Sequence, residues 1–179
     1  KTTAFTKKSY ESTFTFAGIT KLTAMYDILN NLHSWNRYIL LIALIFVLFR
    51  AYSGWLGKKQ YGKADNAASA AALGFTHLQL LLGLLLYVTS PRTNEAFADM
   101  GAAMKNSWLR YFAVEHMLVM LIAVAAIQVG RTLSKKASSD EQKFKKLAIW
   151  TSVGVGLIIL SLAPKGLLFS TANAAMMAQ

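Results

Sequence analysis

Three histidines and one glutamate stand inside or beside long apolar segments of this 179-residue chain. His33 opens the first such segment, His77 lies within the second, and His116 lies in the third, directly after Glu115. An ionisable side chain is costly within a membrane span and usually points into the helix bundle, so each is a candidate for binding or proton chemistry. Neutral imidazole is also a good ligand for iron. The chemistry to consider is therefore cofactor ligation and proton transfer inside apolar surroundings.

The composition indicates an integral membrane protein. Hydrophobic residues make up 55% of the chain and charged residues 15%, whereas soluble domains carry about 25% charged residues. The absence of cysteine excludes a thioether-linked haem, a thiolate-bound cluster or zinc site, disulfides and a cysteine nucleophile. The net charge of +11 is better explained by cytoplasmic loops than by nucleic-acid binding.

Four segments are long and apolar enough to cross a bilayer core of about 30 Å, which needs about 20 helical residues. We therefore predict an all-α, integral membrane four-helix bundle over residues 25–179, preceded by a peripheral N-terminal extension, residues 1–24. Apolar residues at helical spacing from Leu22 to Leu32 predict a short amphipathic helix in the membrane interface. The predicted spans cover about residues 32–55, 68–90, 108–130 and 147–170.

Basic residues predict the orientation of the spans, because cytoplasmic loops are enriched in lysine and arginine. The loops after the first and third spans hold ten basic residues, against five on the other side after Met25, or nine when the leader is counted. We therefore expect both loops in the cytoplasm and both termini in the periplasm. The ten are Arg50, Lys58, Lys59, Lys63, Arg131, Lys135, Lys136, Lys143, Lys145 and Lys146, and the five are Arg37, Arg92, Lys105, Arg110 and Lys165.

Two of the histidines lie at similar depths in neighbouring spans. At 1.5 Å per residue, His77 is ~15–20 Å and His116 ~12 Å from the outer edge. Two imidazoles so placed could ligate one b-type haem iron from opposite sides. Arg37, Lys105 and Arg110 would then meet the haem propionates. The competing interpretation is that the histidines are ordinary packing or hydrogen-bonding residues.

His33 lies nearer the outer surface, which disfavours a zinc or copper site built from all three histidines. Glu115 is either paired with a cation or part of a proton or quinol route, for which His33 is a second candidate. Arg110 is five residues earlier and is not expected to share the helix face of Glu115, so His33, Arg37 or a partner chain would supply its contact.

Small and amide residues in the spans predict helix packing. We expect Gln79 and Gln128 to form hydrogen bonds between helices. Close packing is the expectation for the four glycines Gly74, Gly83, Gly154 and Gly156.

Five longer motifs lie between about Met25 and Pro164. In these motifs the chain resembles a family of small four-helix bacterial inner-membrane proteins described as cytochrome b-like. The resemblance implies haem ligation by His77 and His116, with His33 and Arg37 at the outer edge. The motifs are LHSWNRY at 32–38, FRAYSGWLGKK at 49–59, HLQLLLGLLLY at 77–87, AMKNSWLRYFAVEHMLVM at 103–120 and IQVGR at 127–131.

The leading functional hypothesis is a b-type cytochrome-like subunit of the bacterial inner membrane that passes electrons between quinol and a partner redox protein. The cofactor would be haem b, and the chain would belong to a respiratory or other membrane-protein complex. The alternative is a haem-free accessory subunit of such a complex. A proton-coupled carrier using Glu115 is a weaker hypothesis, because the sequence shows no internal repeat or broken helix.

Overall fold

The computed structural model describes residues 2–168, with side chains from residue 23 onward. This part of the chain is helical and contains no strand. The elements are α1 (Thr2–Leu56), α2 (Lys63–Thr89), α3 (Pro91–Ala98), α4 (Met100–Lys105), α5 (Ser107–Arg110), the π-helical turn η1 (Tyr111–Glu115), α6 (His116–Lys136), α7 (Asp140–Leu162) and the 3₁₀ turn η2 (Ala163–Lys165).

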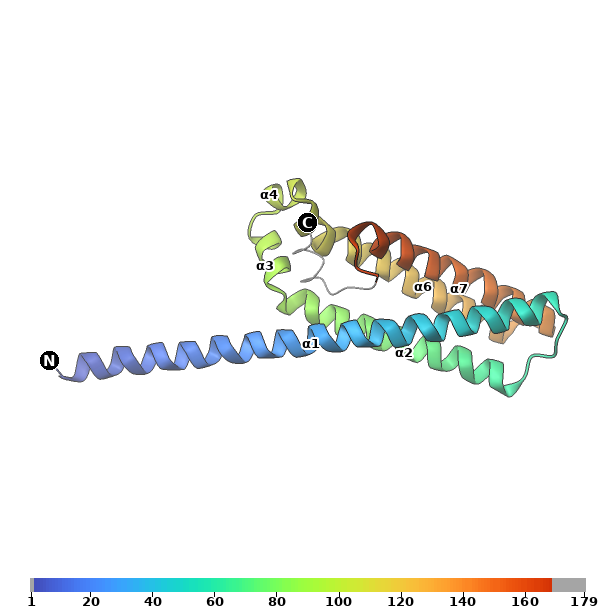
Figure 1. The fold of residues 1–179 in the computed structure, drawn as a ribbon, viewed down its shortest axis with the longest axis horizontal. Coiled ribbons are helices and arrows are strands. Elements are labelled where there is room, and N and C mark those ends of the chain that lie inside the picture. The colour runs from blue at the N-terminus through green and yellow to red at the C-terminus, as the bar shows by residue number, and fades with distance from the viewer. Residues whose placement is uncertain (1, 169–179) are drawn as a thin grey trace.

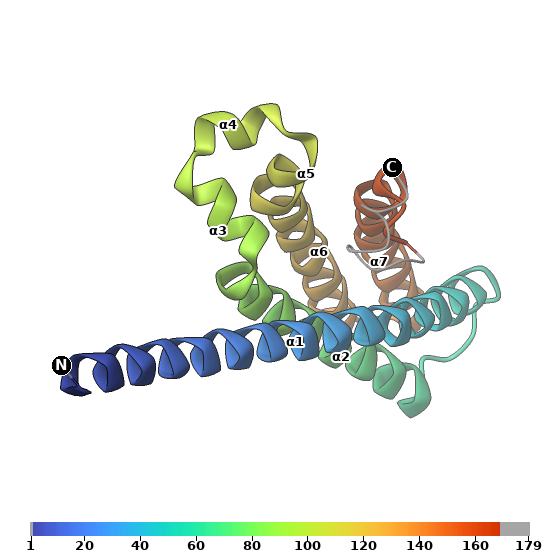
Figure 2. The ribbon, with the colours of Figure 1, turned by 60° about the vertical axis from the view of Figure 1, so that its left-hand side comes forward.

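Four long apolar helices form the bundle, which confirms the predicted fold class. They are long and apolar enough to cross a membrane over Thr23–Leu56, Lys63–Thr89, Ser107–Lys136 and Asp140–Lys165. Residues 169–170, predicted as the end of the fourth span, lie outside the described residues. Helix α1 packs against α2 and α7, and α6 packs against the same two helices, so the four make a closed ring (Figures 1 and 2). The chain is a multi-pass membrane protein.

Helix α1 runs without interruption from Thr2 to Leu56, and its N-terminal half projects beyond the bundle (Figure 1). The prediction of a separate interfacial helix from Leu22 to Leu32 is therefore wrong. Neither glycine nor proline occurs between Gly18 and Gly54, so no residue in this stretch favours a break. Whether residues 1–24 act as a peripheral extension stays a prediction.

Three short helices, α3, α4 and α5, connect α2 to η1 at one end of the bundle (Figure 2). Pro91 begins α3, where its missing N–H leaves no hydrogen bond unmade. The side chain of Asp99 accepts from the backbone N–H of Ala102 at 2.9 Å and caps α4. Asn106 caps α5 in the same way. These caps turn the chain back into the bundle just before η1.

Polar contacts and glycines join the helices at the opposite end. Arg50 Nη2 lies 2.7 Å from the buried carboxylate of Asp65, which ties α1 to α2. Arg131 donates to the Ser69 hydroxyl at 2.6 Å and ties α6 to α2. A Cβ atom added to Gly54 would lie 2.5 Å from the ring of Phe144, so α1 and α7 approach closely there.

The structure confirms close packing for only part of the predicted glycine set. A Cβ atom on Gly154 would lie 2.6 Å from Ile127 and 3.1 Å from the Ala123 carbonyl oxygen on α6. At Gly83 the nearest atom belongs to the ring of His33, at 3.3 Å. At Gly74 and Gly156 an added Cβ atom would meet nothing within 4 Å, so the prediction is wrong for these two.

This difference predicts opposite effects for two alanine substitutions on one helix. Gly154→Ala should lower the free energy of unfolding by about 1–3 kcal/mol, because the added methyl group forces α6 and α7 apart. Gly156→Ala has open space and should leave the stability unchanged or raise it by up to about 1 kcal/mol, since alanine favours helix more than glycine does. Denaturation in mixed micelles measures both, and equal effects would contradict the α6–α7 packing.

Candidate functional site

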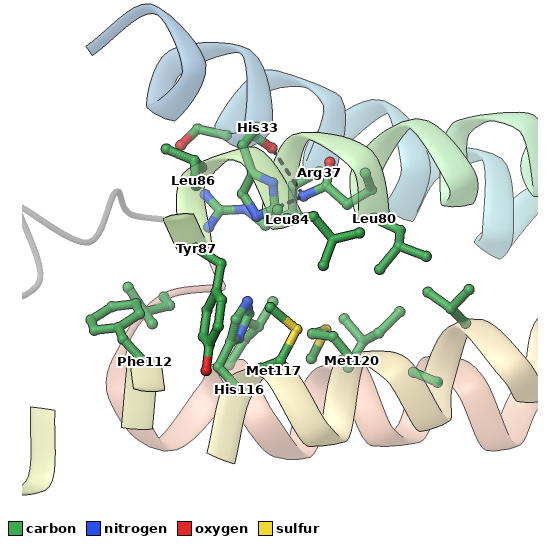
Figure 3. A pocket seen from close by; sticks show the side chains of 18 of the residues that line it. His33, Arg37, Leu80, Leu84, Leu86, Tyr87, Phe112, His116, Met117 and Met120 are labelled. Carbon is green, nitrogen blue, oxygen red and sulfur yellow. Dashed lines mark hydrogen bonds between the residues drawn. The ribbon is translucent and has the colours of Figure 1, made fainter. Parts of the chain in front are cut away.

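A cavity of about 160 Å³ lies between α1, α2 and α6, in the half of the bundle next to α3. Its walls are mainly apolar, with polar side chains contributed from three helices. In Figure 3, His33 and Arg37 reach it from α1, whereas His116, Met117 and Met120 reach it from α6 on the opposite side. The helix ring therefore encloses two of the three histidines at one place.

Gln79 holds His33 in the wall of the cavity. The Gln79 amide nitrogen lies 3.1 Å from His33 Nε2 and donates to the His33 carbonyl oxygen at 3.0 Å. Its oxygen accepts from Asn36 at 2.7 Å, which fixes the amide orientation. Because an amide nitrogen only donates, His33 Nε2 is the acceptor, and the neutral ring carries its proton on Nδ1.

The protonated edge of His33 has no partner in the part of the chain with described side chains. Its Nδ1 atom is buried and forms no hydrogen bond there. A buried donor of this kind is costly and calls for an acceptor or a small local shift. The same edge faces Gly83, whose missing side chain lets the ring approach α2.

His116 is held from the other side of its ring. Its Nδ1 atom lies 3.2 Å from the hydroxyl of Tyr111, which also lies 3.1 Å from the Ser161 carbonyl oxygen in the last turn of α7. Tyr111 is buried, and its ring centroid is 5.4 Å from that of His116. The Nε2 edge of His116 is therefore the one left toward the cavity.

The π-helical turn η1 brings Tyr111 and His116 together. It places the backbone N–H of His116 on the carbonyl of Tyr111, five residues earlier, instead of the usual four. The carbonyl of Ala113 inside this turn accepts from the Tyr87 hydroxyl of α2 at 2.6 Å. Residues five apart thus share a face here, which they do not do in an α-helix.

The same turn corrects the expectation for Glu115. Arg110 Nε lies 2.6 Å from Glu115 Oε1, so the two residues do share a face and form an ion pair. The expected partners His33 and Arg37 line the cavity instead. Glu115 ends η1, is partly exposed and does not line the cavity. Structural pairing is the role that its geometry supports.

The expected pairing of His77 with His116 has to be revised. His77 is exposed on the outside of α2 and does not line the cavity, whereas Thr76, Gln79 and Leu80 do. Successive helical residues differ by about 100° in direction, so the residue after Thr76 turns away from the bundle. His33 occupies the position across from His116 that was expected for His77.

Of the three basic residues expected near a cofactor, Arg37 reaches the cavity. Its side chain is buried and donates to the Tyr38 hydroxyl at 3.1 Å. Lys105 ends α4 and is exposed, and Arg110 is engaged with Glu115, so neither lines the cavity. Sequence reasoning missed Tyr111 as a site residue, and only an unusual turn brings it there.

Comparisons with protein-family models, with curated proteins and with solved structures found no match for this chain. The resemblance to the cytochrome b-like family therefore stays a prediction.

Two glutamines in the spans should differ in their contribution to stability. Gln79→Leu should lower the free energy of unfolding by about 1–3 kcal/mol, because it removes contacts with Asn36 and His33 across two helices. Gln128 bonds Thr132 on its own helix, contrary to the expected bond between helices, so Gln128→Leu should change stability little. Denaturation in mixed micelles compares them, and an equal loss would contradict the role of Gln79.

Proposed function

We propose that the chain is a membrane subunit that binds the ring of a quinol in this cavity and passes its electrons to a partner redox protein. The observation that carries the proposal is the placement of His33 and His116 on opposite walls of one small apolar cavity within the bundle. The walls carry the ring of His33 on one side and the ring of His116, whose Nδ1 atom is held by Tyr111, on the other. A quinol carries two hydroxyl groups on opposite sides of its ring.

The size of the cavity supports a single ring. An engineered cavity of about 150 Å³ holds one benzene molecule, and the cavity here measures about 160 Å³. Apolar side chains such as Leu80, Leu84 and Met120 line it and suit a lipid-soluble molecule. Mainly apolar walls with a few placed polar groups are typical of small-molecule sites.

The partner redox protein is the oxidant in this quinol oxidation. Two O–H bonds of the quinol break, two C=O bonds form, two protons are released and two electrons go to the partner redox protein. The part of this chain is to bind the ring, orient its hydroxyl groups and accept a proton at His116 Nε2. The low polarity around the ring strengthens these hydrogen bonds.

Haem b is the second candidate, and one observation favours it. The His116 Nδ1 atom is held by a hydrogen bond, which is how proteins orient a ligating imidazole and leave Nε2 to the metal. His33 lies across the cavity and Arg37 could meet a propionate. A porphyrin macrocycle is several rings wide, so haem would require a wider space between α1 and α6 than the cavity of about 160 Å³, and His33 would have to release its contact with Gln79.

We propose that the protein resides in a bacterial inner membrane with both termini in the periplasm. The α1–α2 and α6–α7 connections lie at one end of the bundle, and these connections together with the adjoining helix ends carry ten basic residues, between positions 50 and 63 and between positions 131 and 146. This orientation places the cavity in the outer half of the membrane, where protons from the quinol would leave toward the periplasm.

Cysteine labelling tests the orientation. Cysteines at Lys59 and Lys136 should be protected from an impermeant reagent in intact cells, whereas a cysteine at Arg92 should react. The physical reason is that positively charged loops are retained in the cytoplasm. Labelling at position 136 without labelling at position 92 would reverse the orientation and place the cavity in the cytoplasmic half.

Substitution of two histidines tests quinol binding. His116→Leu should weaken the binding of tetramethyl-p-benzoquinol by about tenfold, because it removes the acceptor in the cavity. His77→Leu is the matched control and should leave binding unchanged, since His77 is exposed outside the cavity. Quenching of tryptophan fluorescence in nanodiscs measures the dissociation constants.

Two other outcomes would reject quinol binding in favour of a different function. A low-spin b-type spectrum in protein from a haem-replete host, lost in His116→Leu, would identify a cytochrome. Wild-type protein that binds neither quinol nor haem would favour the haem-free accessory subunit.

A further inference from the structure

Tyr111 has more hydrogen-bond neighbours than its single hydroxyl proton can serve. Its oxygen lies 3.1 Å from the Ser161 carbonyl oxygen, 3.2 Å from His116 Nδ1 and 3.3 Å from the Ser161 hydroxyl. A carbonyl oxygen only accepts, so the contact with it requires the tyrosine proton. The hydroxyl is then left to accept from the histidine.

We infer that Tyr111 is a positioning residue that holds neutral His116 as the Nδ1–H tautomer, with the Nε2 lone pair directed into the cavity. The hydrogen bonds would run from His116 Nδ1 to the Tyr111 oxygen, and from the Tyr111 hydroxyl to the Ser161 carbonyl oxygen. Which ring nitrogen of a histidine stays unprotonated is set by the hydrogen bond that the other makes.

The backbone makes this arrangement possible. Because η1 stacks residues five apart, the Tyr111 ring lies against the His116 ring with a centroid distance of 5.4 Å. Tyr111 is 3% exposed and is packed in the main core cluster, so its hydroxyl has little freedom. The Tyr87 contact with the Ala113 carbonyl holds the same turn from α2. A π-helical turn inserted into a span is often found at a functional site.

The tautomer has a consequence for the ligand, and this consequence rests on the proposed function. An Nε2 lone pair accepts a hydrogen bond from a quinol hydroxyl but offers nothing to a quinone oxygen, which also only accepts. In oxidation one quinol O–H bond breaks as an Nε2–H bond forms, the second hydroxyl group releases its proton, and both electrons go to the partner redox protein. The cavity should therefore bind quinol more tightly than quinone.

Nitrogen-15 NMR of histidine-labelled protein in nanodiscs, without ligand, tests the tautomer directly. The His116 signals, identified by their loss in His116→Leu, should show a protonated Nδ1 and a bare Nε2. Tyr111→Phe keeps the ring but removes the hydroxyl, and should move the population toward the Nε2–H form. Tyr52→Phe is the matched control, because it also removes a tyrosine–serine bond between helices, to Ser152, but far from His116.

Two results would overturn the inference. One is a wild-type His116 in the Nε2–H form, and the other is an unchanged tautomer in Tyr111→Phe. Folding of Tyr111→Phe is checked by comparing its denaturation with that of Tyr52→Phe. If Tyr111→Phe does not fold, Ser161→Ala takes its place. This variant removes the Ser161 hydroxyl but keeps the carbonyl oxygen that accepts from Tyr111, so the His116 tautomer should stay unchanged. A change to the Nε2–H form would contradict the hydrogen-bond chain from His116 through Tyr111 to the Ser161 carbonyl oxygen.

Binding separates this inference from the proposed function. Tyr111→Phe should weaken tetramethyl-p-benzoquinol binding by about fivefold, the effect of one hydrogen bond, and should not weaken binding of the oxidised quinone, because the Nε2–H form of His116 can donate to a quinone oxygen. An equal loss of affinity for the quinol and for the quinone would contradict the role of the His116 tautomer in selecting quinol. Wild-type protein that shows the expected tautomer but binds no quinol would reject the proposed function alone.

Discussion

The structure depends on the cost of placing polar side chains in hydrocarbon surroundings, where each must find a partner inside the bundle. Asn36 and Gln79 meet this cost by bonding each other between α1 and α2, and Gln79 also holds one nitrogen of His33. Tyr111 and His116 meet it through Ser161 on α7. These two groups approach the cavity from opposite sides, so the contacts that stabilise the bundle also orient the histidines that face its interior.

Much of the fold could be predicted from the sequence, because length and hydropathy determine which segments can cross a membrane. Each predicted span overlaps one of the four long helices, and the predicted ends differ from those of the helices by one to nine residues. The beginning of α1 was harder to predict, because an amphipathic surface helix and the continuation of a span have similar apolar spacing. The continuous helix instead reflects the absence of glycine or proline after Gly18.

The site was only partly predictable, because depth along a helix does not give the direction of a side chain. His77 and His116 have similar depths, yet His77 points away from the bundle. The expected side-chain direction is also wrong at η1, because the wider π-helical turn brings Arg110 and Glu115 onto one face, where they form an ion pair. Nothing in the local sequence marks this π-helical turn, so the roles of Tyr111 and Glu115 required the structure.

The central claim is that a quinol ring lies between His33 and His116, and photolabelling tests it most directly. A short-chain azidoquinone, reduced in native membranes and irradiated, should modify residues of α1 between His33 and Leu41 and of α6 between His116 and Met120. Peptide mass spectrometry locates the adducts, and excess tetramethyl-p-benzoquinol should suppress them. Adducts confined to the outward face of α2 around His77, or adducts that excess quinol does not suppress, would contradict the account.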